Sequence, residues 1–373
     1  MPEHLHKRKH LTSFQLIILG FAGVILIGAL ILTLPVSSAS GVVTPFDQAL
    51  FTSTSAVCVT GLVVQDTGSY WSVFGQAVIL ALIQIGGLGV VTVADKPSGR
   101  GQKLTESPVK KYAVENNLPV FQPEKLRNPE FLEEMRKLEA DVFVVVAFRM
   151  MPKVLFEMPK LGTFNLHASL LPDYRGAAPI NFAIINGEEK TGATTFFINE
   201  KIDEGNILLQ EELPILPDEN AGSLHDRLME MGAKLVVKTL DGLAENSITE
   251  QPQPQVAEPK NAFKIFKEDT RIHWNQETVK VHNFIRGMSP YPCAFTTLKI
   301  GEETKGLKIY AGTFEVSEHQ KTAGTLEISK NIFRIYTKDG FYQPTEVQLE
   351  GKKRMNVKDF LNGFHSFDDI KIA

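Results

Sequence analysis

Hydrophobic and polar positions are distributed unevenly along this chain. No charged residue occurs in Leu16–Leu34 or in Gly68–Ala94, whereas charged residues recur throughout the sequence from Asp95 onward. The apolar run Phe14–Leu34 covers about 20 residues, the length that a helix needs to cross ~30 Å of hydrocarbon. The pattern therefore predicts an apolar N-terminal part followed by a water-soluble part.

Each apolar run predicts a transmembrane helix. The basic residues of Met1–His10 precede Phe14–Leu34, and by the positive-inside rule they stay in the cytoplasm. A second run begins at the aromatic pair Tyr70–Trp71, which suits the headgroup layer, and continues to about Ala94. Two spans return the chain to the cytoplasm, so we expect this segment in the bacterial inner membrane with both ends cytoplasmic.

The segment Thr44–Val64 lies between the two apolar runs and is rich in Ser and Thr. Pro45 opens a short predicted helix, and extended backbone follows it, comprising Cys58, Val59, Thr60 and Gly61. Irregular backbone at membrane depth is tolerated where it lines a polar path, which favours a re-entrant pore loop. An extracellular linker is the alternative interpretation of the same pattern.

Beyond residue 90, short apolar runs alternate with helical periodicity. Val90–Ala94 either ends the second span or forms a buried strand. The predicted strands are Pro119–Phe121, Asp141–Ala147, Gly162–Leu166 and Ala193–Ile198, and the predicted helices are 107–117, 129–139, 178–186 and 223–244. The continuous apolar run in Asp141–Ala147 is typical of a strand buried on both faces. This alternation predicts an α/β domain with an open, doubly wound, Rossmann-like sheet.

The pattern changes again after the last long helix. Ser247–Lys260 contains Gln-Pro-Gln-Pro-Gln, which predicts a linker without a core. Short alternating strands then predict a small OB-like β-barrel, at 307–311, 324–328, 332–337 and 346–349. We therefore expect a membrane segment at 1–89, a catalytic domain at 90–246, a linker at 247–262 and a second domain at 263–373.

Charge and cysteine content narrow the function classes. The chain has a net charge of -4, yet residues 261–373 carry 17 Lys and Arg against 14 Asp and Glu. Lys352-Lys353-Arg354 is the one dense basic cluster there, and it is either a solvated turn or a contact to a phosphate backbone. Cys58 and Cys293 supply neither a disulfide framework nor metal-ligand spacing, which fits a reducing compartment.

Candidate chemistry lies at the end of the predicted strand Gly162–Leu166. Asn165 and His167 are two residues apart, so on an extended segment they share a face. An amide and an imidazole at a strand end can stabilise an oxyanion, although two such residues also occur together for structural reasons. Asp203 stands in a turn after the strand Ala193–Ile198, and a carboxylate near His167 favours the imidazolium. A simple turn residue is the alternative for Asp203.

Several motifs give these residues a family context. Asn165-Leu-His-Ala-Ser-Leu-Leu-Pro-Asp-Tyr-Arg-Gly-Ala-Ala-Pro-Ile180 is similar to the signature of methionyl-tRNA formyltransferases. The same family is resembled at Asp95–Gly101, Ile202–Gly205, Ala221–Leu228, Arg271–Trp274 and Ser289–Pro292, in the right order over about 95–365.

This resemblance implies transfer of a formyl group from 10-formyltetrahydrofolate to the amino group of methionyl-tRNA, without a metal. In the family pattern Asn165 and protonated His167 stabilise the carbonyl oxygen, and Asp203 orients His167 and accepts a proton. The folate pocket is lined by Ser169, Leu170, Leu171 and Pro172. Arg100 contacts the tRNA acceptor end, and the OB-like domain holds the tRNA by charge. The enzyme part is expected to be a cytoplasmic monomer.

The resemblance also implies that a structural unit is missing. The family begins with a strand, a Gly-Thr-Pro turn and a helix before the position of Val90, and this sequence has none of them. That strand is normally central, so its loss exposes neighbouring strands and opens the folate pocket. We therefore expect a truncated Rossmann-like domain of impaired activity.

A different family is resembled by the first 90 residues. Thr52–Leu62 and Leu82–Gly89 are similar to the first membrane–pore–membrane unit of Trk/Ktr-type potassium-transport subunits, in which Gly61 takes the place of the filter glycine. That family needs four such units around one pore, and this chain has one. Three interpretations stay open: a formyltransferase, a fragment of a potassium-transport subunit joined to it by gene fusion or artefact near Gly87–Ala94, and a membrane-tethered formyltransferase.

Overall fold

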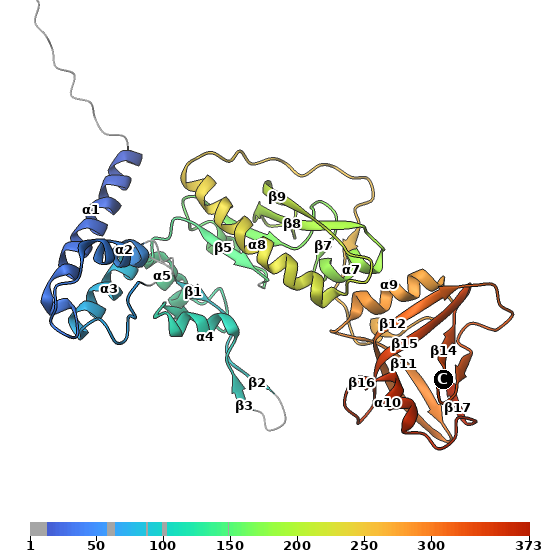
Figure 1. Cartoon of the computed structure of the whole chain (residues 1–373). Coiled ribbons are helices and arrows are strands. Elements are labelled where there is room, and N and C mark those ends of the chain that lie inside the picture. Colours follow the sequence, from blue (N-terminus) through green and yellow to red (C-terminus); the bar gives the residue numbers. More distant parts are fainter. Residues whose placement is uncertain (1–12, 58–63, 87–88, 99–102, 148) are drawn as a thin grey trace, which may run out of the picture. The chain divides into compact units, whose positions relative to one another are not determined.

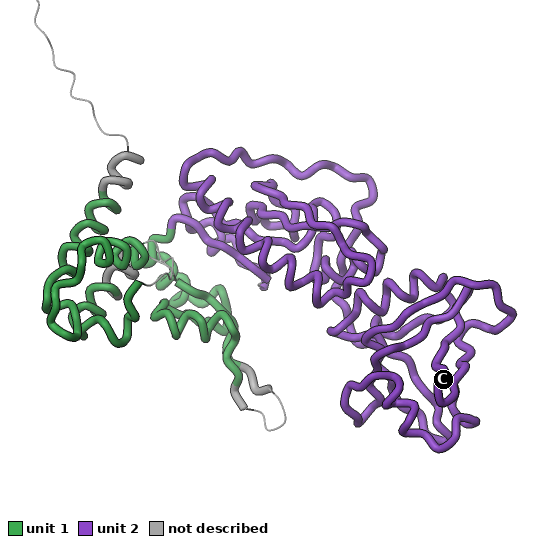
Figure 2. Tube along the Cα trace, in the orientation of Figure 1, with its two compact units in different colours: residues 1–140 green, residues 141–373 purple. Residues whose placement is uncertain are grey.

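The computed structural model describes residues 13–57, 64–86, 89–98, 103–147 and 149–373. The chain divides into two compact units, residues 1–140 and residues 141–373, which Figure 2 shows in green and purple.

The first part of unit 1 is helical. It contains α1 (Ser13–Thr33), a short 3-10 turn at Pro35–Ser37, α2 (Phe46–Val57) and α3 (Val73–Gly86). Helix α2 follows Pro45, as predicted. The buried hydrophobic cluster of this part comprises Leu32, Ala49, Ala56, Val57, Trp71 and Ile79.

The predicted transmembrane helices are not supported. Among the residues that the structure describes, no helix combines the length and the apolarity needed to cross a membrane. Helix α3 has 14 residues and is therefore about 21 Å long, whereas the hydrocarbon layer is ~30 Å thick. The apolar run that was expected to continue this helix instead reaches a strand at Val90. The predicted filter residues Cys58, Val59, Thr60 and Gly61 lie outside the described residues.

The second part of unit 1 is a small α/β arrangement. Strand β1 (Val90–Val91) pairs in parallel with β4 (Val120–Phe121), and β2 (Lys96–Ser98) pairs antiparallel with β3 (Lys103–Thr105). The helices are α4 (Pro108–Glu115) and α5 (Pro129–Lys137), each opened by a capping side chain, from Ser107 and Asn128. Of the two interpretations of Val90–Ala94, the strand is the one observed.

Unit 2 begins with a four-stranded sheet in the order β5-β6-β8-β9. The strands are β5 (Phe143–Val146), β6 (Thr163–His167), β8 (Lys190–Phe197) and β9 (Ile207–Pro214). Only β5 and β6 are parallel, whereas β6–β8 and β8–β9 are antiparallel. The Rossmann-like domain is supported, and the predicted strand Ala193–Ile198 is β8; the sequence pattern did not predict β9 or the antiparallel course of these two strands. The connection 198–206 contains no crossover helix, and strands joined by such a hairpin must be antiparallel.

Strand β5 was expected to be buried on both faces, and it is not. Val144 is 40% exposed and Val146 is 55% exposed, while β5 stands at one end of its sheet order. The other strands are covered by the long helix α8 (Ala221–Ala244), which crosses the sheet in Figure 1. Gly232 of α8 lies so close to Leu166 that an added Cβ would come within 2.9 Å of Leu166 Cδ2. The closely packed face of this sheet is therefore the one covered by α8.

The predicted linker has no helix, but it is fixed to the sheet. Gln251 exchanges backbone hydrogen bonds with Ile207 of β9, and β10 (Asn261–Ala262) pairs in parallel with β7 (Arg175–Gly176). Gly176 has φ of +121°, and a Cβ there would lie 2.3 Å from the Ala262 carbonyl oxygen. A glycine is therefore required at position 176, where β10 of the linker pairs with β7.

The rest of unit 2 is a curved sheet with one long helix against it. Its strand order is β13-β14-β15-β12-β11-β17, with β16 added beside β15. The bounds are α9 (Thr278–Met288), β11 (Ala294–Ile300), β12 (Glu303–Val316), β13 (Leu326–Ile328), β14 (Phe333–Tyr336), β15 (Gly340–Leu349), β16 (Met355–Asn356), α10 (Val357–Asn362) and β17 (Ile370–Ile372). The four predicted strands overlap β12, β13, β14 and β15, of which β13 and β14 are shorter than predicted, and the barrel-like sheet is confirmed.

The two halves of unit 2 meet through helices. The short helices of the first half are α6 (Lys153–Phe156) and α7 (Pro179–Ile185), and α7 packs against α9. Asn181 Nδ2 donates to the Gly287 carbonyl oxygen at 2.7 Å, and Arg286 Nη1 donates to the Glu219 carbonyl oxygen at 2.8 Å. Gly287 permits the close approach, because a Cβ there would lie 3.1 Å from Asn181 O.

Candidate functional site

Asn165 and His167 lie on β6, on the same face of the strand as predicted. Asn165 is paired with Val145 of β5 and Phe196 of β8, and His167 is paired with Thr194. His167 is only 6% exposed, and its ring packs edge-on against the Phe196 ring, with the two ring centroids 6.5 Å apart. The sheet therefore holds the imidazole in one place.

Both ring nitrogens of His167 face a polar partner. Nε2 lies 2.8 Å from the carbonyl oxygen of Tyr174, and Nδ1 lies 3.8 Å from Asp203 Oδ2. A carbonyl oxygen can only accept, so Nε2 carries the proton of that hydrogen bond. The Nδ1–Oδ2 separation is too long for a hydrogen bond, but it places the carboxylate beside the ring.

Asp203 occupies the loop between β8 and β9, where the sequence pattern placed it. Its side chain is largely buried, and Oδ2 accepts a hydrogen bond from the Gly176 backbone N–H at 2.9 Å. The residue has φ of +54°, a left-handed conformation that few non-glycine residues adopt. The prediction that this turn brings a carboxylate beside His167 is met by the geometry.

One end of the Asn165 amide is buried without a partner. Among the described residues, nothing hydrogen-bonds to Asn165 Oδ1. Most buried polar atoms in folded proteins are paired, so an unpaired one marks a place where a further group can bind. Rotation of the amide about its last bond exchanges its oxygen and nitrogen, and places a donor at the same position.

The segment predicted to line the folate pocket, Ser169–Pro172, is held by hydrogen bonds from side chains of β8 and β9. Thr194 Oγ1 donates to the Ser169 carbonyl oxygen at 2.6 Å, and Gln210 Nε2 donates to the Leu171 carbonyl oxygen at 3.0 Å. The side chains of Ser169 and Leu171 are buried, whereas Leu170 and Pro172 are partly exposed. Only the latter two side chains are accessible, and the folate assignment stays a prediction for all four.

The predicted tRNA contacts divide into two cases. Arg100 lies outside the described residues, although Asp95 at the start of its motif is fixed by Lys110 Nζ at 2.5 Å. The hydrogen bond from Lys110 is the largest cause that lowers the pKa of Asp95. In the Lys352-Lys353-Arg354 cluster, Arg354 is paired in a bidentate manner with Glu346, with both contacts at 2.5 Å. Two lysines of the cluster are exposed.

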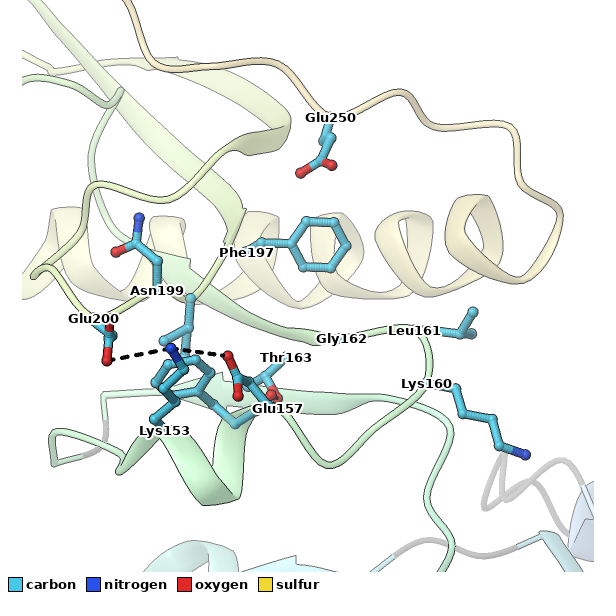
Figure 3. A pocket seen from close by; sticks show the side chains of 12 residues that line it. Lys153, Glu157, Lys160, Leu161, Gly162, Thr163, Phe197, Asn199, Glu200 and Glu250 are labelled. Carbon is cyan, nitrogen blue, oxygen red and sulfur yellow. Dashed lines mark hydrogen bonds and ion pairs between the residues drawn. The ribbon is translucent and has the colours of Figure 1, made fainter.

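Two surface depressions belong to other parts of unit 2. The larger, about 550 Å³, lies where β6 begins and is lined by residues of α6, β6, β8 and the linker, including Lys153, Glu157, Glu200 and Glu250. Figure 3 shows Lys153 between Glu157 and Glu200, with Nζ 3.7 Å from each. The smaller, about 480 Å³, lies beside α8. Neither is lined by Asn165, His167 or Asp203.

Sequence reasoning missed the groups that hold the candidate site together. These are the Tyr174 carbonyl, the Gly176 N–H, Thr194, Gln210 and Gln253. Tyr174 and Gly176 belong to the motif that carried the family resemblance, so the motif was the available signal. Gln253 is the middle residue of the Gln-Pro-Gln-Pro-Gln run, which predicted only a linker and gave no sign of a contact to the site.

Comparisons with known proteins identify a family for both parts of unit 2. The family model described as formyl transferase matches residues 63–240, and the one described as formyl transferase, C-terminal domain, matches residues 264–365. The N-terminal match begins before residue 90, where the catalytic domain was expected to start. A potassium-transport origin of the N-terminal part is not supported by these matches.

Two curated relatives carry the name methionyl-tRNA formyltransferase. The one from Flavobacterium johnsoniae is 50% identical over 285 residues, which are 76% of this chain and 90% of the relative. The one from Parabacteroides distasonis is 50% identical over 294 residues, 77% of this chain and 90% of the relative. A solved N-formyltransferase from Helicobacter canadensis is 24% identical to this chain. The match covers 70% of this chain and 86% of that chain, with a TM-score of 0.49.

The two family models cover the strand that bears Asn165 and His167, the loop that bears Asp203, and all of the curved C-terminal sheet except β17. By this extent and level of identity, the chain belongs to the methionyl-tRNA formyltransferase family.

Proposed function

We propose that this chain transfers the formyl group of 10-formyltetrahydrofolate to the amino group of methionyl-tRNA. The observation that carries the proposal is the unpaired, buried Oδ1 of the Asn165 amide on the strand that bears His167, which itself lies beside Asp203. In the reaction the amino nitrogen bonds to the formyl carbon, and negative charge develops on the formyl oxygen. A preorganised amide donor at that oxygen lowers the barrier, because it stabilises charge that is present only in the transition state.

His167 and Asp203 supply the remaining charge. Nε2 is held by Tyr174 and Nδ1 faces Asp203, so the imidazole is fixed in orientation. In the proposed mechanism His167 acts as an imidazolium that adds positive charge beside the oxyanion, with the Asp203 carboxylate 3.8 Å from its Nδ1. The bond from the formyl carbon to the folate nitrogen then breaks. The amine loses a proton to the Asp203 carboxylate, directly or through water, and the folate nitrogen takes up a proton as it leaves.

Binding of the two substrates is assigned to different segments. Ser169, Leu170, Leu171 and Pro172 line the folate pocket, and Arg100 contacts the acceptor end of the tRNA. Residues 90–246 form the catalytic domain, without the family's first strand and helix, residues 247–262 form the linker, and residues 263–373 hold the tRNA. Exposed Lys352 and Lys353 fit a phosphate contact.

The test is formylation of methionyl-tRNA by the full chain and by Asn165→Ala, His167→Ala and Asp203→Ala variants. Each substitution is expected to lower kcat by about 100-fold or more, which is the usual cost of losing one oxyanion donor. Asp226→Ala is the matched control, because its carboxylate is 76% exposed and pairs only with neighbouring His225 among the described contacts. Near-normal turnover in one of the three variants removes that residue from the mechanism, and no formylation by the full chain removes the proposal.

A further inference from the structure

The Asp203 loop is held in a conformation that it would not adopt alone. Asp203 is left-handed at φ of +54°, and its carboxylate accepts a hydrogen bond from the Gly176 backbone N–H. Gly205 is pressed so closely on the end of β8 that an added Cβ would lie 1.5 Å from the Phe197 carbonyl oxygen. A strained loop keeps its shape only where surrounding groups fix it.

The side chain of Gln253 holds this loop by hydrogen bonds to the loop's backbone. Its Nε2 donates to the carbonyl oxygen of Asp203 at 2.8 Å and to that of Gly205 at 2.9 Å. Both protons of one amide nitrogen are therefore used on the same loop. Gln253 is partly buried, while the next glutamine of the Gln-Pro-Gln-Pro-Gln run, Gln255, is exposed.

The other end of the Gln253 amide binds Arg175. Arg175 Nη2 and Nε donate to Gln253 Oε1 at 2.6 Å and 3.1 Å, and Arg175 Nη1 lies 3.4 Å from Glu204 Oε1. Arg175 stands between Tyr174, whose carbonyl holds His167 Nε2, and Gly176, whose N–H holds the Asp203 carboxylate. One amide thus joins the loop of Asp203 to the segment that holds both catalytic side chains.

We propose that Gln253 is a positioning residue for formyl transfer, which holds the Asp203 carboxylate at His167 by clamping the 203–205 loop to Arg175. The inference rests on the proposed function and extends it into the linker. Gln253 contacts neither reacting group, so it acts through Asp203. Its loss leaves the substrate pockets in place and displaces one carboxylate. The expected signature is a lower kcat, by about 10- to 100-fold, with little change in KM, because small misplacements of reacting groups cost rate.

The first experiment needs no activity. Hydrogen exchange of the full chain is measured by mass spectrometry for Gln253→Ala and for the matched control Gln255→Ala. Gln253→Ala is expected to speed exchange in peptides covering 199–206 and at Gly176, because the carboxylate that protects the Gly176 N–H moves away. Gln255→Ala leaves both regions unchanged. Equal exchange in the two variants overturns the clamp, whether or not the chain is a formyltransferase.

The second experiment separates positioning from general damage. Formylation kinetics are compared for Gln253→Ala, Asp203→Ala and the double variant. A residue that acts only through Asp203 adds little once Asp203 is gone, so the double variant should lie within about threefold of Asp203→Ala. Independent, multiplying losses would show general damage and overturn the proposal.

A conservative variant tests the chemistry of the clamp. Gln253→Glu keeps an acceptor for Arg175 but replaces the donor nitrogen with a carboxylate oxygen that faces two carbonyl oxygens. It is expected to be at least as impaired in kcat as Gln253→Ala. Wild-type kcat in Gln253→Glu, with Asp203→Ala still inactive, overturns the clamp and leaves the proposed function standing. No formylation by the unaltered chain refutes the proposed function instead.

Discussion

The two sheets of unit 2 differ in how completely their faces are covered. In the C-terminal sheet Leu298, Leu307, Ile309 and Ile335 are each 0% exposed, within one continuous core that includes α9. In the catalytic sheet β6 and β8 are buried beneath α8, but Val144 and Val146 of β5 are exposed. The C-terminal sheet therefore carries its own core, whereas no described residue of unit 2 buries Val144 and Val146 of β5.

This difference matters because the candidate site is built on the less complete sheet. Asn165 is paired with Val145 of β5, so the position of the amide depends on the strand whose other face is open. The His167–Asp203 pair depends instead on β8, β7 and the linker. We infer that the amide is the more vulnerable part of the site and the imidazole the more secure.

The largest expected effect comes from completing the catalytic sheet. Replacing residues 1–89 with the first strand, turn and helix of a family member should raise formylation by about 100-fold, because a fixed β5 holds Asn165 in place. The measurement is steady-state formylation of methionyl-tRNA. The control is removal of residues 1–89 alone, which should improve solubility without raising activity. A full chain as fast as the completed one would show that the catalytic sheet is as self-sufficient as the C-terminal one.

A smaller effect compares one side chain from each sheet. Leu298→Ala in the C-terminal core should lower the free energy of unfolding by about 2–5 kcal/mol, through lost burial and a residual cavity. Val146→Ala in β5 should cost less than about 1 kcal/mol, because the side chain is 55% exposed. Urea unfolding followed by circular dichroism measures both. A similar cost at the two positions would mean that β5 is covered in solution, and the contrast between the sheets would fail.

The smallest expected effect concerns the acid sensitivity of a partly buried histidine in the C-terminal half of unit 2. His282 of α9 has a buried Nδ1 with no partner among the described residues, and it packs against Phe314 at 4.6 Å. Burial, and then the nearby Arg286, lower the pKa of His282 to about 4, while Asp218 opposes them. Between pH 6.5 and about pH 4 the unfolded chain binds a proton that the folded chain does not. Stability is therefore complete above pH 6.5 and falls as the pH drops.

The size of that loss is limited by solvent access. The depressed pKa sets an upper limit of ~3 kcal/mol, and partial exposure reduces the expected loss to about 1–2 kcal/mol. His282→Phe should flatten the pH dependence of the unfolding free energy between pH 7 and pH 4. The exposed His225→Phe is the control and should leave it unchanged. An unaltered slope in His282→Phe would assign the acid sensitivity to other groups.

Much of the local structure follows from short-range signals. Ser107 and Asn128 cap α4 and α5, and the apolar runs at 162–166 and 193–198 became β6 and β8. The two-residue spacing of Asn165 and His167 was enough to place both on one face of a strand. The membrane spans were not supported, because apolar composition alone does not distinguish a spanning helix from the short helix α3 and the strand β1.

Local sequence signals were sufficient to predict many of the helices and strands, and short motifs pointed to the Asn165–His167–Asp203 set. Those features depend on neighbours within a few residues or on short motifs. Only the tertiary structure decided the antiparallel course of β8 and β9, the exposure of β5, and the hydrogen bonds of Gln253, which lies 50 residues from Asp203. Such contacts join segments far apart in the chain, and nothing in local hydrophobic periodicity or turn chemistry encodes which distant carbonyl an amide will meet.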